Sequence, residues 1–191
     1  VVPAVNITNC TTKVFKTPHA PGSRGDENIR AASVAMATSA APTYFPSIKI
    51  GTELYADGGM FAVAPDLIAM HEAENFMKVD ASRIRMLSIG TATANYRPMS
   101  KLSEKDGAVE WLSDGRLILS LISVQQQHVQ SMMEDQLRDR YLHLDADWPV
   151  EAELGIDIAT PEAAKILLRL ASDTLRQPKV VRAFKRYLRT V

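Results

Sequence analysis

The sequence predicts an α/β fold in which a layered sheet is flanked by helices and followed by a helical C-terminal part. Two observations support this prediction. Short β-type runs alternate with helical segments over the first half of the chain, as is typical of layered α/β domains. From residue 107 onward, apolar residues recur mostly at helical spacing. The chain has 191 residues, 46% of them hydrophobic, and can therefore bury the core of one ordinary domain.

The first forty residues predict two strands and one helix. The β-type runs 1–7 and 11–15 indicate a hairpin or two neighbouring strands. Segment 16–27 contains two Pro and two Gly and is expected to form a loop. At its end, Asp26 is a good N-cap for an Ala-rich helix that runs to about Thr38. Pro42 disfavours the helical conformation at the residue before it, so that helix should stop ahead of it.

The middle of the chain predicts a second strand pair, a helix and a buried strand. The runs 47–50 and 53–56 flank Gly51-Thr52 and are expected to form a hairpin. Pro65 suits the first turn of a helix that extends to about Met77. The apolar run "RIRMLSIGT", residues 83–91, is typical of a buried strand that leads into a polar loop at 92–106.

The last third predicts three helices and one strand. Apolar residues at helical spacing indicate a helix over 118–137, and the run 139–147 is expected to contain a late strand. Thr160-Pro161-Glu162 is a helix start, and the helix after it carries an apolar face. A final helix begins at Lys179. The apolar residues of these last two helices are Ala164, Leu167, Leu168, Ala171 and Leu175, then Val181, Phe184 and Leu188.

Composition excludes several classes of function. Lys and Arg total 22, as do Asp and Glu, so no excess of positive charge favours nucleic acid as a partner. No apolar run is long enough to span a membrane, and one cysteine, Cys10, cannot form an internal disulfide. We therefore expect a reducing, cytoplasmic location. The four histidines are not spaced as metal ligands, so neither a metal nor a cofactor is expected.

The stretch "LYADGGMFA", residues 54–62, is the first candidate for chemistry. Asp-Gly is a common strand-to-helix turn, and composition alone favours that interpretation. Alternatively, two glycines after Asp57 permit a close backbone approach, and a carboxylate held at a strand end could accept a proton from a nucleophilic hydroxyl. In layered α/β sheets, ligands bind beyond the carboxyl ends of strands, where Asp57 and the run ending in Gly90 are both expected.

Three motifs in one order make the sequence recognisable. "ATSAAP" at 37–42, "DGG" at 57–59 and "LSIGT" at 87–91 together resemble the patatin-like phospholipase family, over roughly residues 1–95. The resemblance implies that residues 1–191 are the C-terminal part of a single acyl hydrolase domain, with a motif-bearing core at about 1–95 and a mostly helical remainder at 107–191. It also implies hydrolysis of acyl esters of lipids by a Ser-Asp dyad. Asp57 would be its aspartate, and Gly58 and Gly59 would form the backbone of the site.

Two positions depart from the family pattern. The family often has Asn-Asn-Pro after D-G-G, where this chain has Val63-Ala64-Pro65. It also often has Gly after S-L-G-T, where this chain has Ala92. Neither difference removes the carboxylate.

The family's nucleophile motif, G-x-S-x-G, does not occur among the 191 residues. Ser39 and Ser88 belong to the other motifs and are not assigned as nucleophiles. Because the family's serine precedes the region that this chain covers, we expect the chain to be the C-terminal part of such an enzyme. Its fold would be incomplete on the N-terminal side, and alone it would be inactive.

The partners expected are a phospholipid or another acyl lipid and an N-terminal segment of the same protein that carries the serine. The basic, amphipathic helix from Lys179 could also contact anionic headgroups, which would place the protein at the membrane periphery. The pattern by itself favours the simpler explanation, a solvated basic face on a packed helix. The alternative function is a catalytically dead patatin-fold module that binds or regulates. A G-x-S-x-G encoded upstream of Val1 would favour the enzyme.

Overall fold

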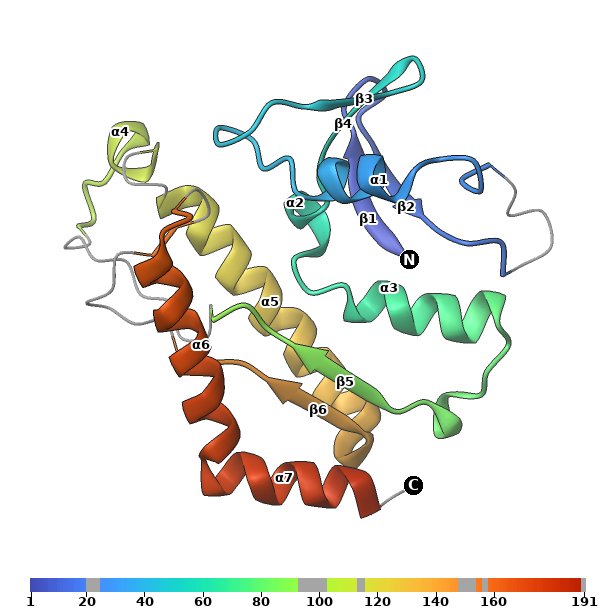
Figure 1. The fold of residues 1–191 in the computed structure, drawn as a ribbon, viewed down its shortest axis with the longest axis vertical. Coiled ribbons are helices and arrows are strands. Elements are labelled where there is room, and N and C mark those ends of the chain that lie inside the picture. Colours follow the sequence, from blue (N-terminus) through green and yellow to red (C-terminus); the bar gives the residue numbers. More distant parts are fainter. Residues whose placement is uncertain (20–24, 93–102, 113–115, 148–153, 156–157, 190–191) are drawn as a thin grey trace. The chain divides into compact units, whose positions relative to one another are not determined.

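A computed structural model describes residues 1–19, 25–92, 103–112, 116–147, 154–155 and 158–189 (Figure 1). The chain divides into two compact units, Val1–Ile84 and Arg85–Val191. The first contains a sheet with helices, and the second contains two strands and most of the helical residues. The predicted α/β class with a helical C-terminal part is therefore confirmed. The expectation of one domain over 1–191 stays a prediction.

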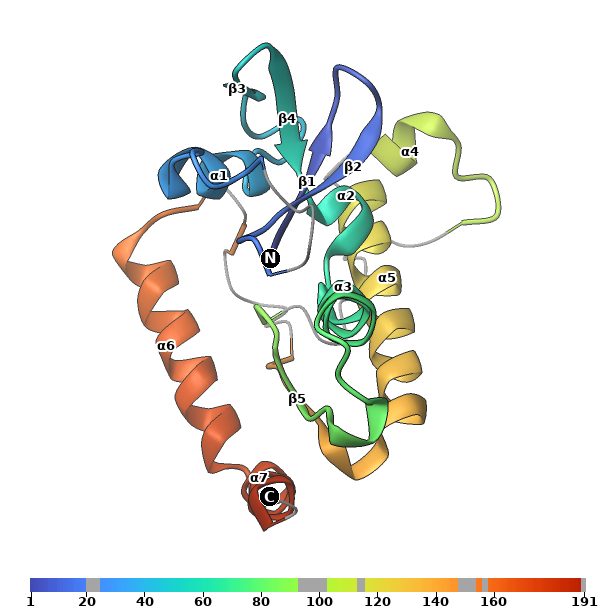
Figure 2. The same cartoon turned by 90° about the vertical axis from the view of Figure 1, so that its right-hand side faces the viewer.

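The first unit is built on a four-stranded antiparallel sheet in the order β2-β1-β4-β3 (Figure 2). β1 (Val2–Asn6) and β2 (Thr11–Phe15) form one predicted hairpin, and β3 (Ile48–Ile50) and β4 (Glu53–Asp57) form the other. Gly51 takes the left-handed φ of 62° that the tight turn between β3 and β4 requires. β1 also pairs with β4, which joins the two hairpins.

Helix α1 (Ala31–Thr38) covers one face of this sheet. Side chains alternate between the faces of a strand, and the cross-strand register places Ala4, Phe15 and Tyr55 on the same face. They form the buried core of the unit together with Ala37 of the helix.

The predicted start of this helix is wrong. Asp26 is not its N-cap, because α1 begins at Ala31, after Arg30. The Asp26 carboxylate instead accepts hydrogen bonds from Lys13 Nζ at 2.7 Å and from the backbone N–H of Lys16 at 3.0 Å. These bonds connect the loop to the end of β2, and the carboxylate lies there and not at the start of α1.

After β4 the chain turns into the short helix α2 (Gly59–Ala62) and then α3 (Asp66–His71). A π-helical turn, Glu72–Phe76, continues α3, so the predicted helix ends close to Met77 as expected. Pro65 precedes the first residue of α3 and does not lie within it. A 3₁₀ turn, Ala81–Arg83, completes the unit.

The second unit contains the parallel strands β5 (Met86–Ile89) and β6 (Tyr141–Leu144). Parallel neighbours need a crossover connection, here α4 (Ala108–Leu112) and the long helix α5 (Arg116–Leu137). A 3₁₀ turn, Arg138–Arg140, follows α5, which packs against β6. The apolar residues that predicted this helix supply the buried Val129, Met133 and Leu137.

Strand β5 is only half-buried, contrary to the prediction from its apolar run. Met86 and Ser88 are buried, whereas Leu87 and Ile89 are 43% and 73% exposed. Alternation follows from the two-residue period of a strand, and one face of β5 has no cover among the described residues of its unit. The predicted loop 92–106 falls largely on 93–102, outside the described residues.

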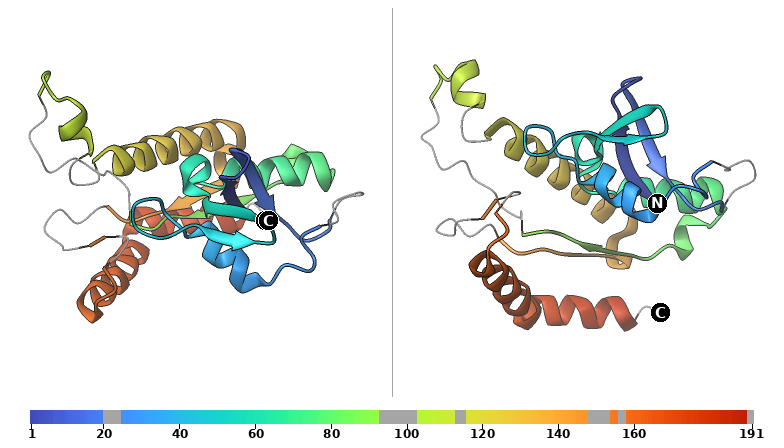
Figure 3. Two further views of the ribbon diagram at one scale, coloured as in Figure 1. Left: turned by 90° about the horizontal axis from the view of Figure 1, so that it is seen from above. Right: turned by 45° about the horizontal axis from the view of Figure 1, so that its top comes forward.

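The two C-terminal helices begin where the sequence predicts. Thr160 caps α6 (Pro161–Arg176) by accepting a hydrogen bond from the N–H of Ala163 at 3.1 Å. Gln177 is extended, and Pro178 starts α7 (Pro178–Arg189), so the two helices meet at a sharp bend (Figure 3). In the described parts of the chain, no helix combines the length and the hydropathy needed to cross a bilayer.

Candidate active site

Asp57 is the last residue of β4, and two neighbouring segments hold its backbone. It lies opposite Ala4 in the antiparallel pair with β1, and its N–H donates to the carbonyl of Ala40 at 3.0 Å. Ala40 belongs to the "ATSAAP" segment. The first two motifs that the sequence singled out therefore meet through a backbone hydrogen bond.

The carboxylate of Asp57 is partly buried and only partly satisfied. Its Oδ1 accepts a hydrogen bond from the N–H of Gly59 at 2.7 Å. Burial raises the pKa of Asp57 above the ordinary aspartate value, and the Gly59 hydrogen bond offsets part of that rise. Among the described residues, no group donates to Oδ2.

Contact distances require glycine at position 58 and leave little room for a side chain at position 59. A Cβ on Gly58 would lie 2.3 Å from the carbonyl oxygen of Pro3 and 2.5 Å from its carbon. A Cβ on Gly59 would lie 3.1 Å from Asp57 Oδ1. Gly58 has α-helical dihedral angles and Gly59 belongs to α2, so neither position uses glycine for an unusual backbone conformation. The missing Cβ atoms instead leave space close to β1 and to the Asp57 carboxylate.

One contact beside Asp57 could not be predicted from the sequence. The hydroxyl of Thr38 donates to the Pro3 carbonyl at 2.6 Å, the same carbonyl that Gly58 approaches. Thr38 ends α1, so this bond fixes the helix end against β1 beside the Asp57 turn. Ser39, the next residue, donates its hydroxyl to the Ala35 carbonyl at 2.8 Å, within its own helix.

The third motif, "LSIGT", lies in the second unit and is part of a buried polar network. Ser88 Oγ lies 3.0 Å from His143 Nδ1, its partner in the parallel register of β5 and β6. Asp145 follows β6 and accepts hydrogen bonds from the N–H of Ala92 at 2.8 Å and from the Gln126 side chain at 2.9 Å. The network thereby ties the end of β5 to β6 and α5.

The network also contains a departure from the family pattern, at Ala92. Ala92 has a φ of 64°, in the left-handed region where glycine is favoured. A Cβ on Gly90 would lie 2.2 Å from the Asp145 carboxyl carbon, so Gly90 leaves room for that carboxylate. Sequence reasoning missed His143 and Asp145. The signal that could have indicated Asp145 is its position directly after β6, because Gly90 directly follows the other strand, β5.

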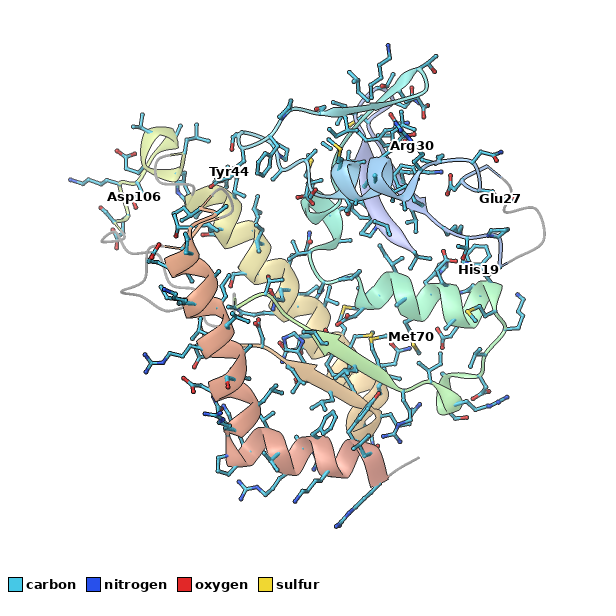
Figure 4. All side chains as sticks on the ribbon, in the orientation of Figure 1. His19, Glu27, Arg30, Tyr44, Met70 and Asp106 are labelled. Carbon is cyan, nitrogen blue, oxygen red and sulfur yellow. The ribbon has the colours of Figure 1, made fainter. Side chains whose placement is uncertain are left out.

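The other candidates do not form a rival centre. His19 lies beside the end of α3, where its Nε2 is 2.6 Å from Glu72 Oε2 (Figure 4). No group of His, Cys, Asp and Glu in the described ranges could hold a metal ion. A hollow of about 600 Å³ in the first unit is lined by Lys13, Asp26 and Tyr55, among others, and Asp57 is not part of its wall.

Comparison with known proteins finds a matching family model and several similar proteins. The family model described as patatin-like phospholipase matches residues 2–70. The chain is 35% identical over 167 residues to a cGAMP-activated phospholipase of Pseudomonas aeruginosa, covering 86% of this chain and 46% of that protein. A cGAMP-activated phospholipase of Vibrio cholerae is 32% identical over 180 residues, 87% of this chain and 51% of its own length.

A plant protein is also similar. Patatin-like protein 2 of Arabidopsis thaliana is 27% identical over 180 residues, which cover 77% of this chain and 44% of the plant protein. The chain thus spans about half of the length of the curated relatives that it matches. The matched family segment contains Asp57, Gly58 and Gly59, and the structure places all three in one turn.

Proposed function

The chain belongs to the patatin-like phospholipase family, and we propose on that basis that it supplies the aspartate of a lipid acyl hydrolase, Asp57. The observation that carries the proposal is the geometry of this carboxylate. One oxygen is fixed by the Gly59 N–H, and the other has no donor among the described residues. The substrate class is a phospholipid or another acyl lipid.

The proposed reaction is acyl transfer through a serine. As the serine oxygen attacks the ester carbonyl carbon, its proton passes to Asp57, and an acyl-enzyme forms when the alcohol part of the lipid leaves with a proton. Water then attacks the acyl-enzyme, releases the fatty acid and restores the serine. Partial burial of Asp57 makes proton uptake more favourable than it is for a carboxylate in water.

We place the serine outside these 191 residues. The sequence contains no G-x-S-x-G, and neither serine of the recognised motifs suits the role. Ser39 is bonded to its own helix, and Ser88 is buried beside His143 in the other unit. The proposal therefore requires a part of the protein that carries the nucleophile, and it predicts that the 191-residue chain alone hydrolyses no ester.

The names of the bacterial relatives supply a candidate control signal. Both bacterial relatives described above are called cGAMP-activated phospholipases, and we extend that mode of control to this protein. An enzyme that depends on a nucleotide signal would hydrolyse no lipid when the nucleotide is absent. Every activity measurement is therefore made with and without cGAMP.

The test is Asp57→Asn in the complete protein, assayed on phospholipid and on a dissolved acyl ester. An amide cannot accept the proton, so we expect turnover to fall by roughly 10²- to 10⁴-fold. Asp139→Asn is the control, because Asp139 is an exposed aspartate in the second unit and should leave turnover unchanged. Near-normal turnover by the Asp57→Asn protein would refute the assignment.

The same assay has a pH signature. Because burial raises the pKa of Asp57, kcat/KM should decline on the acidic side at a pH above the roughly 3.9 of an ordinary aspartate.

The alternative function is a patatin-fold module that binds or regulates. It would be favoured if a protein that carries a G-x-S-x-G showed no hydrolysis either with or without cGAMP.

A further inference from the structure

The surface of helix α7 divides into three parallel stripes, each made of residues at i, i+3 and i+7. Such residues lie along one side of a helix. The first stripe is Val180, Ala183 and Tyr187. The second is Val181, Phe184 and Leu188, and the third is Arg182, Lys185 and Arg189.

The first stripe attaches α7 to its own unit. Its three residues are half-buried, and α7 packs against β6 and the 3₁₀ turn after α5. The guanidinium carbon of Arg85 lies 4.5 Å from the centre of the Tyr187 ring, within cation–π range. The helix is therefore held in a fixed rotation about its axis.

The second stripe is apolar and exposed. Val181, Phe184 and Leu188 are 37%, 39% and 52% exposed. The apolar arc of α7 is thus wider than the part that its unit covers. An isolated exposed apolar residue is ordinary, but three in line beside a packed stripe form a continuous flank.

The third stripe is basic and fully on the surface. Arg182, Lys185 and Arg189 are all exposed. Helix α7 contains five of the 22 Lys and Arg residues of the chain and no Asp or Glu. Because the chain as a whole has zero formal net charge, this helix is a local concentration of positive charge.

We propose that α7 docks on the surface of an anionic phospholipid bilayer, an inference that rests on the proposed lipid substrate. The helix would lie in the plane of the membrane, with Phe184 and Leu188 entering between headgroups while Lys185 and Arg189 contact lipid phosphates. The apolar flank beside the basic stripe favours a bilayer over a nucleic acid, which offers phosphates without an apolar layer behind them.

The experiment measures cosedimentation of the complete protein with vesicles. The protein carries Asp57→Asn, so that the lipid stays intact. Vesicles of phosphatidylcholine alone are compared with vesicles that also contain phosphatidylglycerol, at low and high salt. We expect binding to the phosphatidylglycerol vesicles that weakens as salt rises.

The variant Lys185→Gln with Arg189→Gln should bind those vesicles roughly 25-fold less, about fivefold for each charge. The matched control is Lys49→Gln with Arg83→Gln, two exposed cations of the first unit, which should bind within about twofold of the parent. A second variant, Phe184→Ser with Leu188→Ser, should lower the binding that persists at high salt. Circular dichroism checks that each variant is folded.

Three outcomes would overturn the inference: unchanged binding by the Lys185/Arg189 variant, an equal loss in the control, or no binding by the parent. In the last case light scattering tells whether a second copy covers the flank. Hydrolysis of a dissolved ester is measured separately. Hydrolysis without vesicle binding refutes only the docking surface, whereas vesicle binding through α7 without hydrolysis refutes only the proposed activity.

Discussion

At the scale of single residues, the site depends on one backbone carbonyl. The oxygen of Pro3 accepts the Thr38 hydroxyl and faces the Cα of Gly58, so strand β1, helix α1 and the Asp57 turn meet at one point. The Ala40 carbonyl holds the N–H of Asp57 from the other side. The position of the carboxylate is therefore set by backbone contacts that tolerate no added Cβ at Gly58.

Substituting Gly58 by Ala tests this arrangement. The new Cβ would lie 2.3 Å from the Pro3 oxygen, so the strand or the turn must move. We expect the free energy of unfolding to fall by about 2–3 kcal/mol, measured by chemical denaturation of the complete protein. Gly107→Ala is the control, since its Cβ would meet only Glu110 Oε2 at an ordinary 3.5 Å. Equal stability of the two variants would contradict the close approach.

At the scale of elements, the π-helical turn Glu72–Phe76 is fastened to the end of β2. Glu72 is buried, with Oε1 2.8 Å from Lys16 Nζ and Oε2 2.6 Å from His19 Nε2. Lys16 Nζ also lies 4.1 Å from the centre of the Phe76 ring. Burial by itself would raise the pKa of Glu72, but the hydrogen bonds and charges of Lys16 and His19 outweigh it and hold that pKa below the ordinary value.

Glu72→Gln should therefore destabilise the protein at neutral pH. We expect a loss of about 1–3 kcal/mol in the free energy of unfolding, because two charge-assisted contacts weaken in a buried place. A lowered folded-state pKa gives stability that is present above the unfolded pKa, near 4.5, and lost as pH falls below it.

The difference between the parent and the Glu72→Gln protein should accordingly shrink in acid, which denaturation at several pH values measures. Glu74→Gln is the control, because Glu74 lies in the same turn and is less buried. A difference that grows as pH falls would be inconsistent with the Lys16 and His19 contacts.

At the scale of the whole molecule, the question is whether the units Val1–Ile84 and Arg85–Val191 belong to one domain, as the resemblance predicts. The described part of the second unit has two strands, and Leu87 and Ile89 of β5 are exposed. Parallel strands are normally covered on both faces, and two-stranded sheets are marginal alone. If both units belong to one domain, we expect the second to depend on the first for its stability.

Amide hydrogen exchange of the complete protein measures this dependence. If the chain is one domain, Gly58→Ala in the first unit should lower the protection of the slowest amides of α5 as much as that of the slowest amides of β1 and β4. Gly107→Ala should change neither. Loss of protection confined to Val1–Ile84 would show that the two units unfold independently.

The sequence by itself determined the elements that local interactions decide. Gly51 allows the tight turn of one hairpin, Thr160-Pro161 starts α6, and helical periodicity marks α5 and α7. The position of Asp57 at the end of a strand was also predicted, because the turn chemistry of Asp-Gly-Gly acts over adjacent residues.

Only the tertiary structure decided how distant segments use their polar groups. It pairs β1 with β4, gives the Asp26 carboxylate to Lys13 and Lys16 where a helix cap was expected, and joins Asp145 to Ala92. These contacts connect residues far apart in the chain, and any of several donors could satisfy each acceptor equally well. Burial and packing choose among them, and they also leave the Oδ2 oxygen of Asp57 without a donor among the described residues.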